Sequence, residues 1–134
     1  MTGSPAVVAA MSSVAALRGG VELQQAWLGE HASSVWRLPQ LLSIHRSGGL
    51  ILGVWEEGVP EASPCDGLLV DLPAEADGYA ARHTVVWMVD PAHQGRGLGV
   101  RLRSSERRLL QQQPAEGHAA ALPAGNEVHG HIRR

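Results

Sequence analysis

The chain has 134 residues and a formal net charge of −2, so it fits one domain and carries no general attraction for nucleic acid or an anionic membrane. Hydrophobic residues make up 44% and charged residues 18%, a balance typical of a globular protein. The single cysteine, Cys65, excludes an intramolecular disulfide, and no apolar run approaches the roughly 20 residues of a membrane span. No Lys or Arg precedes the apolar stretch from Ala6 to Leu17, as it would in a signal peptide, so we expect a cytoplasmic protein.

The first part of the chain is expected to begin with a flexible segment and to continue into helices. Residues 1–11 carry Gly, Ser, Pro and Ala without periodicity, which is typical of a mobile chain end. Apolar residues at helical spacing predict a helix over 12–28, although Gly19 and Gly20 in its middle leave two shorter helices as an alternative. The same spacing predicts another helix over 35–45.

Three compact apolar runs predict strands. They extend from Leu50 to Trp55, from Gly67 to Leu72 and from His83 to Val89, and the third is rich in β-branched residues. We expect the first two to form a hairpin-like pair. Residues 59–66 and 73–82 hold proline, acidic and small residues, so both segments are expected to be loops.

The last regular element is expected to be a helix from Gly97 to Gln113, which Pro114 ends. Its leucines are available for burial, whereas its charged residues are expected to be largely solvated: Arg101, Arg103, Glu106, Arg107 and Arg108. The following tail shows little apolar periodicity beyond a short candidate strand at 119–122. We therefore expect one folded domain over residues 12–122 and a poorly ordered tail over residues 123–134.

The turn between the third strand and the last helix carries the chemistry. Glycines at 95, 97 and 99 allow a tight backbone turn in which several N–H groups can converge on a phosphate. The positive N-terminal end of the helix favours the same anion, so a pyrophosphate is the expected ligand. The spacing disfavours Rossmann and P-loop sites, because the third glycine comes one residue too early for G-x-G-x-x-G and no G-K-S/T follows.

The turn resembles the Q/R-x-x-G-x-G/A signature of the GNAT superfamily of CoA-dependent N-acyltransferases. Gln94, Gly97 and Gly99 occupy its positions, and Val-Asp-Pro at residues 89–91 matches its common lead-in. The resemblance covers about residues 20–113. It implies an α/β (α+β) fold with a mixed, mostly antiparallel sheet flanked by helices. The implied activity is transfer of an acetyl group from acetyl-CoA to an amine of a small molecule or a peptide.

The resemblance also implies roles for particular residues. Backbone amides of the turn would bind the CoA pyrophosphate, beside the Gln94 side chain; they belong to Gly95, Arg96, Gly97, Leu98, Gly99 and Val100. The Arg96 guanidinium could add positive charge beside a phosphate. The exposed backbone of the preceding strand would pair with the pantetheine arm, at Trp87, Met88 and Val89.

Acetyl transfer also needs a base for the amine and a proton donor for the departing thiolate. His83 is the first candidate for the base, because an unperturbed histidine titrates near neutral pH. An exposed histidine at a strand end is the alternative interpretation. Asp71 and Glu75 are lesser candidates for a carboxylate that faces the amine. The resemblance places the acid on a later tyrosine, but Tyr79, the single tyrosine, precedes the signature, so this role is unassigned.

Other functions remain as alternatives. The family fold usually continues well past the signature helix, so this domain is expected to be incomplete at its C-terminus. A catalytically inactive module that binds CoA or a protein partner without turnover is therefore the alternative function, and a homodimer could cover an unpaired sheet edge. The arginines of the last helix do not share one face, which disfavours a nucleic-acid site. We expect no metal site, because no Cys or carboxylate cluster joins the tail histidines His118, His129 and His131.

Overall fold

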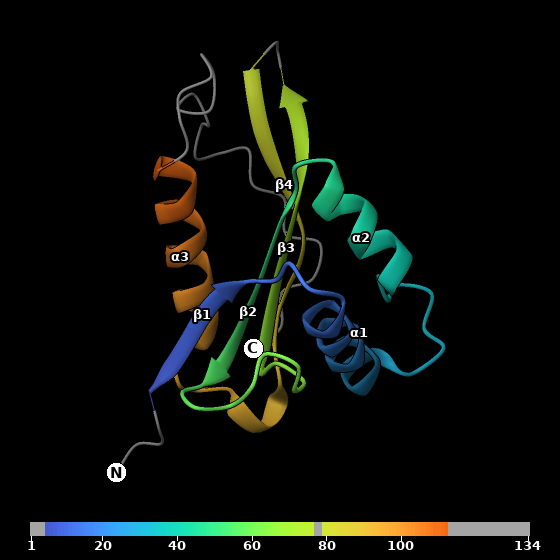
Figure 1. The fold of residues 1–134 in the computed structure, drawn as a ribbon, viewed down its shortest axis with the longest axis vertical. Helices are drawn as coiled ribbons and strands as arrows, with labels where there is room; N and C mark the ends of the chain where they lie inside the picture. The colour runs from blue at the N-terminus through green and yellow to red at the C-terminus, as the bar shows by residue number, and fades with distance from the viewer. Residues whose placement is uncertain (1–4, 77–78, 113–134) are drawn as a thin grey trace.

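The computed structural model describes residues 5–76 and 79–112, and these residues form a two-sided α/β sandwich (Figure 1). The described strands make one four-stranded antiparallel sheet in the order β1-β2-β3-β4. Helices α1 and α2 cover one face of the sheet and α3 covers the other. The elements follow in chain order as β1 (Ala6–Ala10), α1 (Val14–Leu28), α2 (Leu38–Arg46), β2 (Leu50–Glu56), β3 (Gly67–Ala76), β4 (Tyr79–Val89), the 3₁₀ turn η1 (Pro91–His93) and α3 (Leu98–Gln112). The expected α/β class is thus confirmed.

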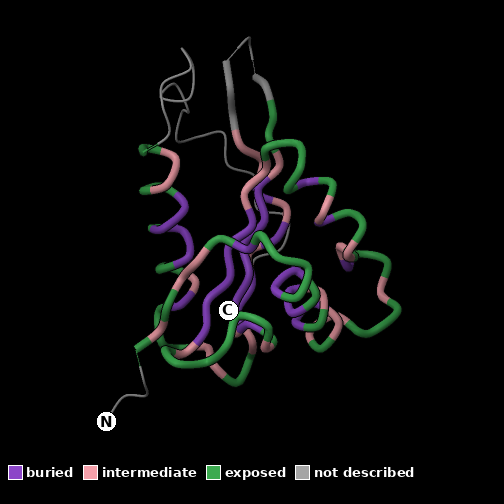
Figure 2. Tube along the Cα trace, viewed as in Figure 1, coloured by how far each residue is buried: buried purple, intermediate pink, exposed green. Residues whose placement is uncertain are grey.

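The central strands are compact apolar runs because helices cover both of their faces. β2 is buried throughout its interior, and alternate residues of β2 and β3 enter two different cores. The core under α1 and α2 contains Met11, Leu17, Leu41, Ile51, Leu68, Val70, Val86 and Met88. The core under α3 contains Leu52, Val54, Leu69, Val89, Leu98 and Leu102. Figure 2 shows buried positions along the middle of the sheet and at intervals along the helices.

Helix α1 is continuous, although its sequence left two shorter helices open. Gly19 and Gly20 permit close contact with the β2–β3 connection and with β3, respectively. A Cβ on Gly19 would lie 3.0 Å from the Ser63 carbonyl oxygen, and one on Gly20 would lie 3.2 Å from a Leu68 methyl. The helix propensity lost at these glycines is therefore offset by packing. Helix α2 has Pro39 in its first turn and buries Leu41 and Ile44.

Two segments expected to lack regular structure are strands. The expectation of a flexible segment over 1–11 is wrong for Ala6–Ala10, which forms β1 and pairs antiparallel with β2. The expectation of a loop over 73–82 is wrong as well, because β3 and β4 continue their pairing out to Ala76 and Tyr79. In both places cross-strand pairing stabilises residues whose own strand propensity is weak.

The expected tail lies outside the described residues, and so do the candidate strand at 119–122 and the three tail histidines. Among the described helices, none is long and apolar enough to cross a membrane.

Candidate functional site

The turn that follows β4 has the backbone shape that its glycines predicted. Gly95 has a φ of 88° and Gly97 a φ of 77°, which are left-handed conformations that glycine adopts without strain. The Asp90 carboxylate accepts from the Ala92 N–H at 3.2 Å and so caps η1 at the start of the turn. The Gln94 side chain folds back and donates to the Val89 carbonyl at 3.2 Å. Gln94 therefore ties the turn to the end of β4.

Consecutive backbone amides in this turn have no internal acceptor. Within the described residues, none of the N–H groups from Gly95 to Val100 donates a hydrogen bond to the protein, and the Arg101 N–H is the first to do so, to the Gly97 carbonyl at 3.0 Å. These amides lie at the N-terminal end of α3, where the helix dipole adds partial positive charge. Val100 is 69% exposed, so the end of the helix is accessible. The arrangement can bind an anion with several negative oxygens.

A tryptophan on β4 fixes the first turn of α3. The Trp87 indole N–H donates to the Gly99 carbonyl at 2.9 Å. A Cβ on Gly99 would lie 3.6 Å from that indole nitrogen, at ordinary contact distance. Gly99 has no left-handed φ, unlike Gly95 and Gly97. The structural contribution of Gly99 is its carbonyl, which accepts from Trp87, and neither the backbone conformation nor the space around it requires glycine.

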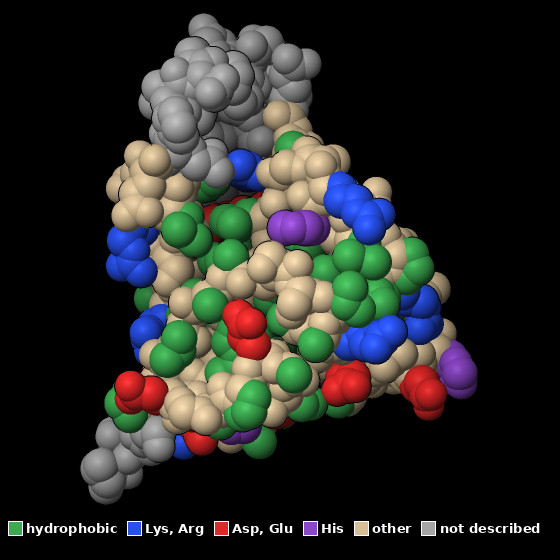
Figure 3. Space-filling model, in the orientation of Figure 1, with side chains coloured by type: hydrophobic (Ala, Val, Ile, Leu, Met, Phe, Trp, Pro, Cys, Tyr) green, Lys and Arg blue, Asp and Glu red, His purple; other side chains and the backbone are tan. Residues whose placement is uncertain are grey.

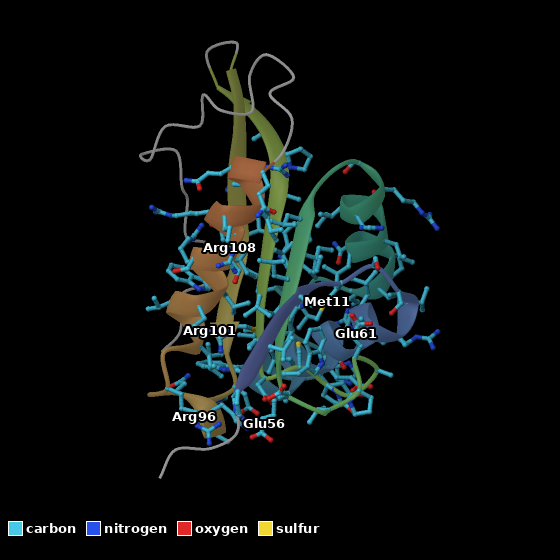
Figure 4. All side chains as sticks on the ribbon, turned by 60° about the vertical axis from the view of Figure 1, so that its left-hand side comes forward. Met11, Glu56, Glu61, Arg96, Arg101 and Arg108 are labelled. Carbon is cyan, nitrogen blue, oxygen red and sulfur yellow. The ribbon has the colours of Figure 1, made fainter. Side chains whose placement is uncertain are left out.

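Arg96 lies at the base of the turn, next to the end of β2 (Figure 4). Its guanidinium is 3.8 Å from the Glu56 carboxylate, and both side chains are more than a third exposed. Surface pairs of this kind contribute little to stability and exchange readily with solvent. The Arg96 side chain is therefore free to turn toward an anion bound by the neighbouring amides.

Strand β4 presents backbone groups at the open edge of the described sheet. The Asp90 N–H donates to the Asp66 carbonyl at 2.8 Å, across the β3 side. Because backbone groups alternate in direction along an antiparallel strand, those of Met88 also face β3, whereas those of Trp87 and Val89 face the open edge. The Val89 carbonyl already accepts from the Trp27 indole of α1 at 2.7 Å. The backbone groups of Trp87 and Val89 therefore face the edge along which an extended ligand would lie, and those of Met88 face β3.

His93 lies between two carboxylates at the start of the turn. Its Nδ1 is 3.3 Å from Asp90 Oδ2, and its Nε2 is 3.7 Å from Asp66 Oδ1. Burial raises the pKa of Asp66 above its usual value, and the nearby His93 opposes that shift. The three side chains are close enough to hold a metal ion. The two ring nitrogens each face a different carboxylate, however, and this arrangement fits a polar bridge between Asp66, just before β3, and the turn better than a chelate, in which one nitrogen and both carboxylates meet.

The candidate bases occupy very different positions. His83 is part-buried on β4, opposite Leu72, and lies about 20 Å along the strand from Val89 at about 3.3 Å per residue. The idea that Asp71 faces an amine is wrong, because Asp71 is 0% exposed and faces α3. The side chains of Glu75 and Tyr79 lie outside the described residues.

Sequence reasoning missed a polar cluster between α3 and the sheet, which consists of Asp71, Thr84, Arg103 and Glu106. Arg103 and Glu106 were expected to be solvated, and this is wrong: they are 8% and 2% exposed. A β-bulge between the Asp71–Thr84 and Val70–Val86 pairs sets the cluster's geometry. It places Thr84 and Trp87 on the same face of β4, and Arg103 contacts both.

The remaining arginines of α3 are spread along its exposed surface. Figure 4 places Arg101 and Arg108 at different levels of the helix, well above Arg96. On the face shown in Figure 3, basic side chains occupy separate places with apolar and neutral surface between them. This distribution differs from the continuous basic stripe of a nucleic-acid site.

Comparison with known proteins identifies the fold. No family model matches the chain, and no curated protein matches its sequence. An acetyltransferase from Trypanosoma brucei is 16% identical with a TM-score of 0.63, over 93% of this chain and 82% of that one. Glucosamine-6-phosphate N-acetyltransferase from Arabidopsis thaliana is 12% identical with a TM-score of 0.64, over 94% and 82%. Ribosomal-protein-alanine N-acetyltransferase from Brucella melitensis is 13% identical with a TM-score of 0.65, over 96% and 81%. The chain therefore has the fold of the GNAT superfamily, which its glycine turn resembles.

Proposed function

We propose that the protein is an N-acetyltransferase that transfers an acetyl group from acetyl-CoA to an amine. The observation that carries this proposal is the run of amides from Gly95 to Val100, which have no acceptor in the described part of the chain and lie at the start of α3. A GNAT fold places such a turn where CoA is expected. The fold likeness to three acetyltransferases, two of which are named for different acceptors, supports the reaction class and leaves the acceptor open.

The cofactor would lie along β4. Its pyrophosphate would occupy the amides of the turn, with Arg96 turning from Glu56 toward the phosphates. Its pantetheine arm would pair with the Trp87 backbone and the Val89 N–H at the open edge. In this direction the thioester end points away from the turn and toward the half of β4 that holds His83.

The reaction replaces the thioester C–S bond by an amide C–N bond and moves one proton from nitrogen to sulfur. The amine nitrogen attacks the thioester carbonyl carbon, the C–S bond breaks, and the amine's proton must leave while the thiolate gains one. We assign the first proton to His83 as the candidate base. The donor for the thiolate has no candidate among the described side chains that face the open edge. The acceptor is a primary amine of a small molecule or a peptide.

A module that binds CoA without turnover is the second candidate. The burial of Asp71 beneath α3 favours this inactive module, because that burial removes one of the three proposed bases. The two functions agree on the cofactor site and differ in whether free CoA is released when amines are offered.

The first experiment compares the melting temperature with and without millimolar acetyl-CoA. A ligand at a hundred times its Kd stabilises the folded state by about 2.7 kcal/mol, which corresponds to an upward shift of about 10 °C in a protein of this size. Gly97→Glu should abolish the shift, because it places negative charge among the amides. Gly48→Glu is the matched control, since Gly48 also has a positive φ and open space around it but lies at the α2–β2 turn.

The outcomes separate the hypotheses. Retention of the shift in Gly97→Glu would overturn the site, and absence of a shift in the wild type would overturn CoA binding altogether. If the shift is present, release of free thiol from acetyl-CoA with a panel of amines distinguishes the enzyme from the inactive module, and His83→Gln should slow that release while leaving the thermal shift intact.

A further inference from the structure

The polar cluster is a connected hydrogen-bond network beneath α3. The Thr84 hydroxyl donates to Asp71 Oδ1 at 2.7 Å and accepts from Arg103 Nη1 at 3.2 Å. The same Arg103 nitrogen donates to Glu106 Oε1 at 2.6 Å. Asp71 and Thr84 are almost completely buried, at 0% and 1% exposure. Two carboxyl groups and one guanidinium thus meet in a site that water barely reaches.

The charges in this cluster do not balance if both acids are ionised. One guanidinium can neutralise one carboxylate, and an unpaired buried charge is strongly unfavourable. In addition, Asp71 Oδ2 is buried and accepts no hydrogen bond within the described residues. A proton on Glu106 would neutralise the second charge and supply a donor for Asp71. In accord with this, the pKa of Glu106 is raised to about 8, chiefly by burial. The hydrogen bond to Asp71 and the negative charge of Asp71 also raise it, whereas Arg103 lowers it.

We propose that Asp71 and Glu106 share one buried proton and that this pair positions α3, with its anion-binding turn, on the sheet. The connection to the turn is a chain of contacts. Arg103 donates to Glu106, and its Cζ lies 4.3 Å from the centre of the Trp87 ring. The Trp87 indole N–H in turn donates to the Gly99 carbonyl. Loss of the proton therefore disturbs the helix whose first amides bind the cofactor. This last step rests on the proposed function.

The described surroundings of Glu106 contain no further charge that could replace the proton. β3 contributes Asp71, β4 contributes Thr84 and Trp87, and α3 itself contributes Arg103. The parts of β1 and β2 under α3 contribute apolar side chains, among them Val8, Leu52 and Val54. Among the described residues, the charge of this interface therefore depends on whether Glu106 and Asp71 are protonated beside Arg103.

The first test is the pH dependence of stability without any ligand. The unfolded chain loses the Glu106 proton near its ordinary pKa of 4.5, whereas the folded protein keeps it to a pKa of about 8. The stabilisation is therefore complete below pH 4.5 and is lost as the pH rises to about 8. Glu106→Gln carries a permanent amide in place of the protonated acid, so its melting temperature should fall less than that of the wild type across this window. Glu61→Gln makes the same change at an exposed glutamate and should retain the wild-type slope.

The second test measures acetyl-CoA binding above pH 8. Deprotonation of Glu106 in the folded state should weaken wild-type binding by up to tenfold per pH unit, because one proton is lost. Glu106→Gln should bind with wild-type affinity at pH 7 and show a smaller loss above pH 8. If Glu106 only filled space, acetyl-CoA binding would not show a pH dependence that Glu106→Gln reduces.

Three results would overturn the proposal. One is a wild-type pH slope in Glu106→Gln. Another is a ¹³C carboxyl NMR titration of the wild-type protein in which Glu106 ionises near its ordinary value, a measurement that is decisive even if the variant fails to fold. The third is unchanged binding above pH 8 while Glu106 ionises. If the slope and titration follow the proposal but acetyl-CoA stabilises the protein at no pH, the shared proton is supported and the proposed function is overturned.

Discussion

Substitution of Gly97 by alanine tests whether the turn needs its left-handed backbone. Gly97 has a φ of 77°, and a Cβ added there would meet nothing within 4 Å. The cost is therefore conformational and not steric. An L-residue in this region costs about 1–2 kcal/mol, part of which is offset because alanine restricts the unfolded chain. We expect Gly97→Ala to lower the free energy of unfolding by about 1 kcal/mol.

Gly99→Ala is the matched comparison two residues later. Gly99 lies in the first turn of α3 without a positive φ, and the new Cβ would make ordinary contacts at 3.6 Å to the Trp87 indole nitrogen and 3.7 Å to a Val89 methyl. Alanine is the better helix former, so this change should raise the free energy of unfolding by about 0.5 kcal/mol. The alanine allowed at this position by the GNAT signature agrees with that expectation.

Urea unfolding of the two variants and the wild type provides the measurement. The variants should differ by about 1.5 kcal/mol, or about 6 °C in melting temperature, in opposite directions from the wild type. Gly99→Ala should also retain acetyl-CoA binding, because it removes no amide. Equal stability of the two variants would refute the assignment of different structural reasons to the two glycines.

Two further predictions concern side chains around this framework. Burial raises the pKa of the Cys65 thiol to about 12, so at pH 8 the folded protein should react with thiol reagents no faster than it unfolds; rapid labelling of the native protein would contradict the burial of this residue. Arg96→Gln should change the free energy of unfolding by less than about 0.5 kcal/mol, because its pair with Glu56 is exposed, but it should weaken acetyl-CoA binding and reduce its salt dependence. Unchanged affinity and salt dependence would show that Arg96 does not reach the phosphates.

The parts of the fold that the sequence predicted are those whose local pattern and tertiary environment agree. β2 and β3 are continuous apolar runs because both of their faces are covered, and the left-handed Gly95 and Gly97 lie where the signature required a tight turn. The GNAT fold followed from that turn and its flanking elements. His83 and Arg96 were predicted to belong to the site, and their roles there remain predictions.

The strands that were not predicted form because they pair with other strands, and their own local sequence gives no sign of that pairing. Ala6–Ala10 consists of alanine and valine next to Gly, Ser and Pro, and it becomes a strand because its backbone pairs with β2. The outer parts of β3 and β4 likewise pair with each other beyond the helix-covered core. Backbone pairing of this kind is encoded by the register of a distant strand, so a periodicity within a short window cannot detect it.

The polar cluster was missed for a different reason, and its signal was present in two places. Glu106 lies four residues after Leu102 and eight after Leu98, so it occupies the buried stripe of α3 even though a charged helix residue is usually solvated. Asp71 lies two residues after Leu69, so it shares the face of β3 that this helix covers. Either acid alone would be interpreted as an exception. Together, on two surfaces that must pack against each other, they indicate a buried pair of acids. Because the one guanidinium that bonds Glu106 can neutralise one carboxylate, the second acid is expected to carry a proton.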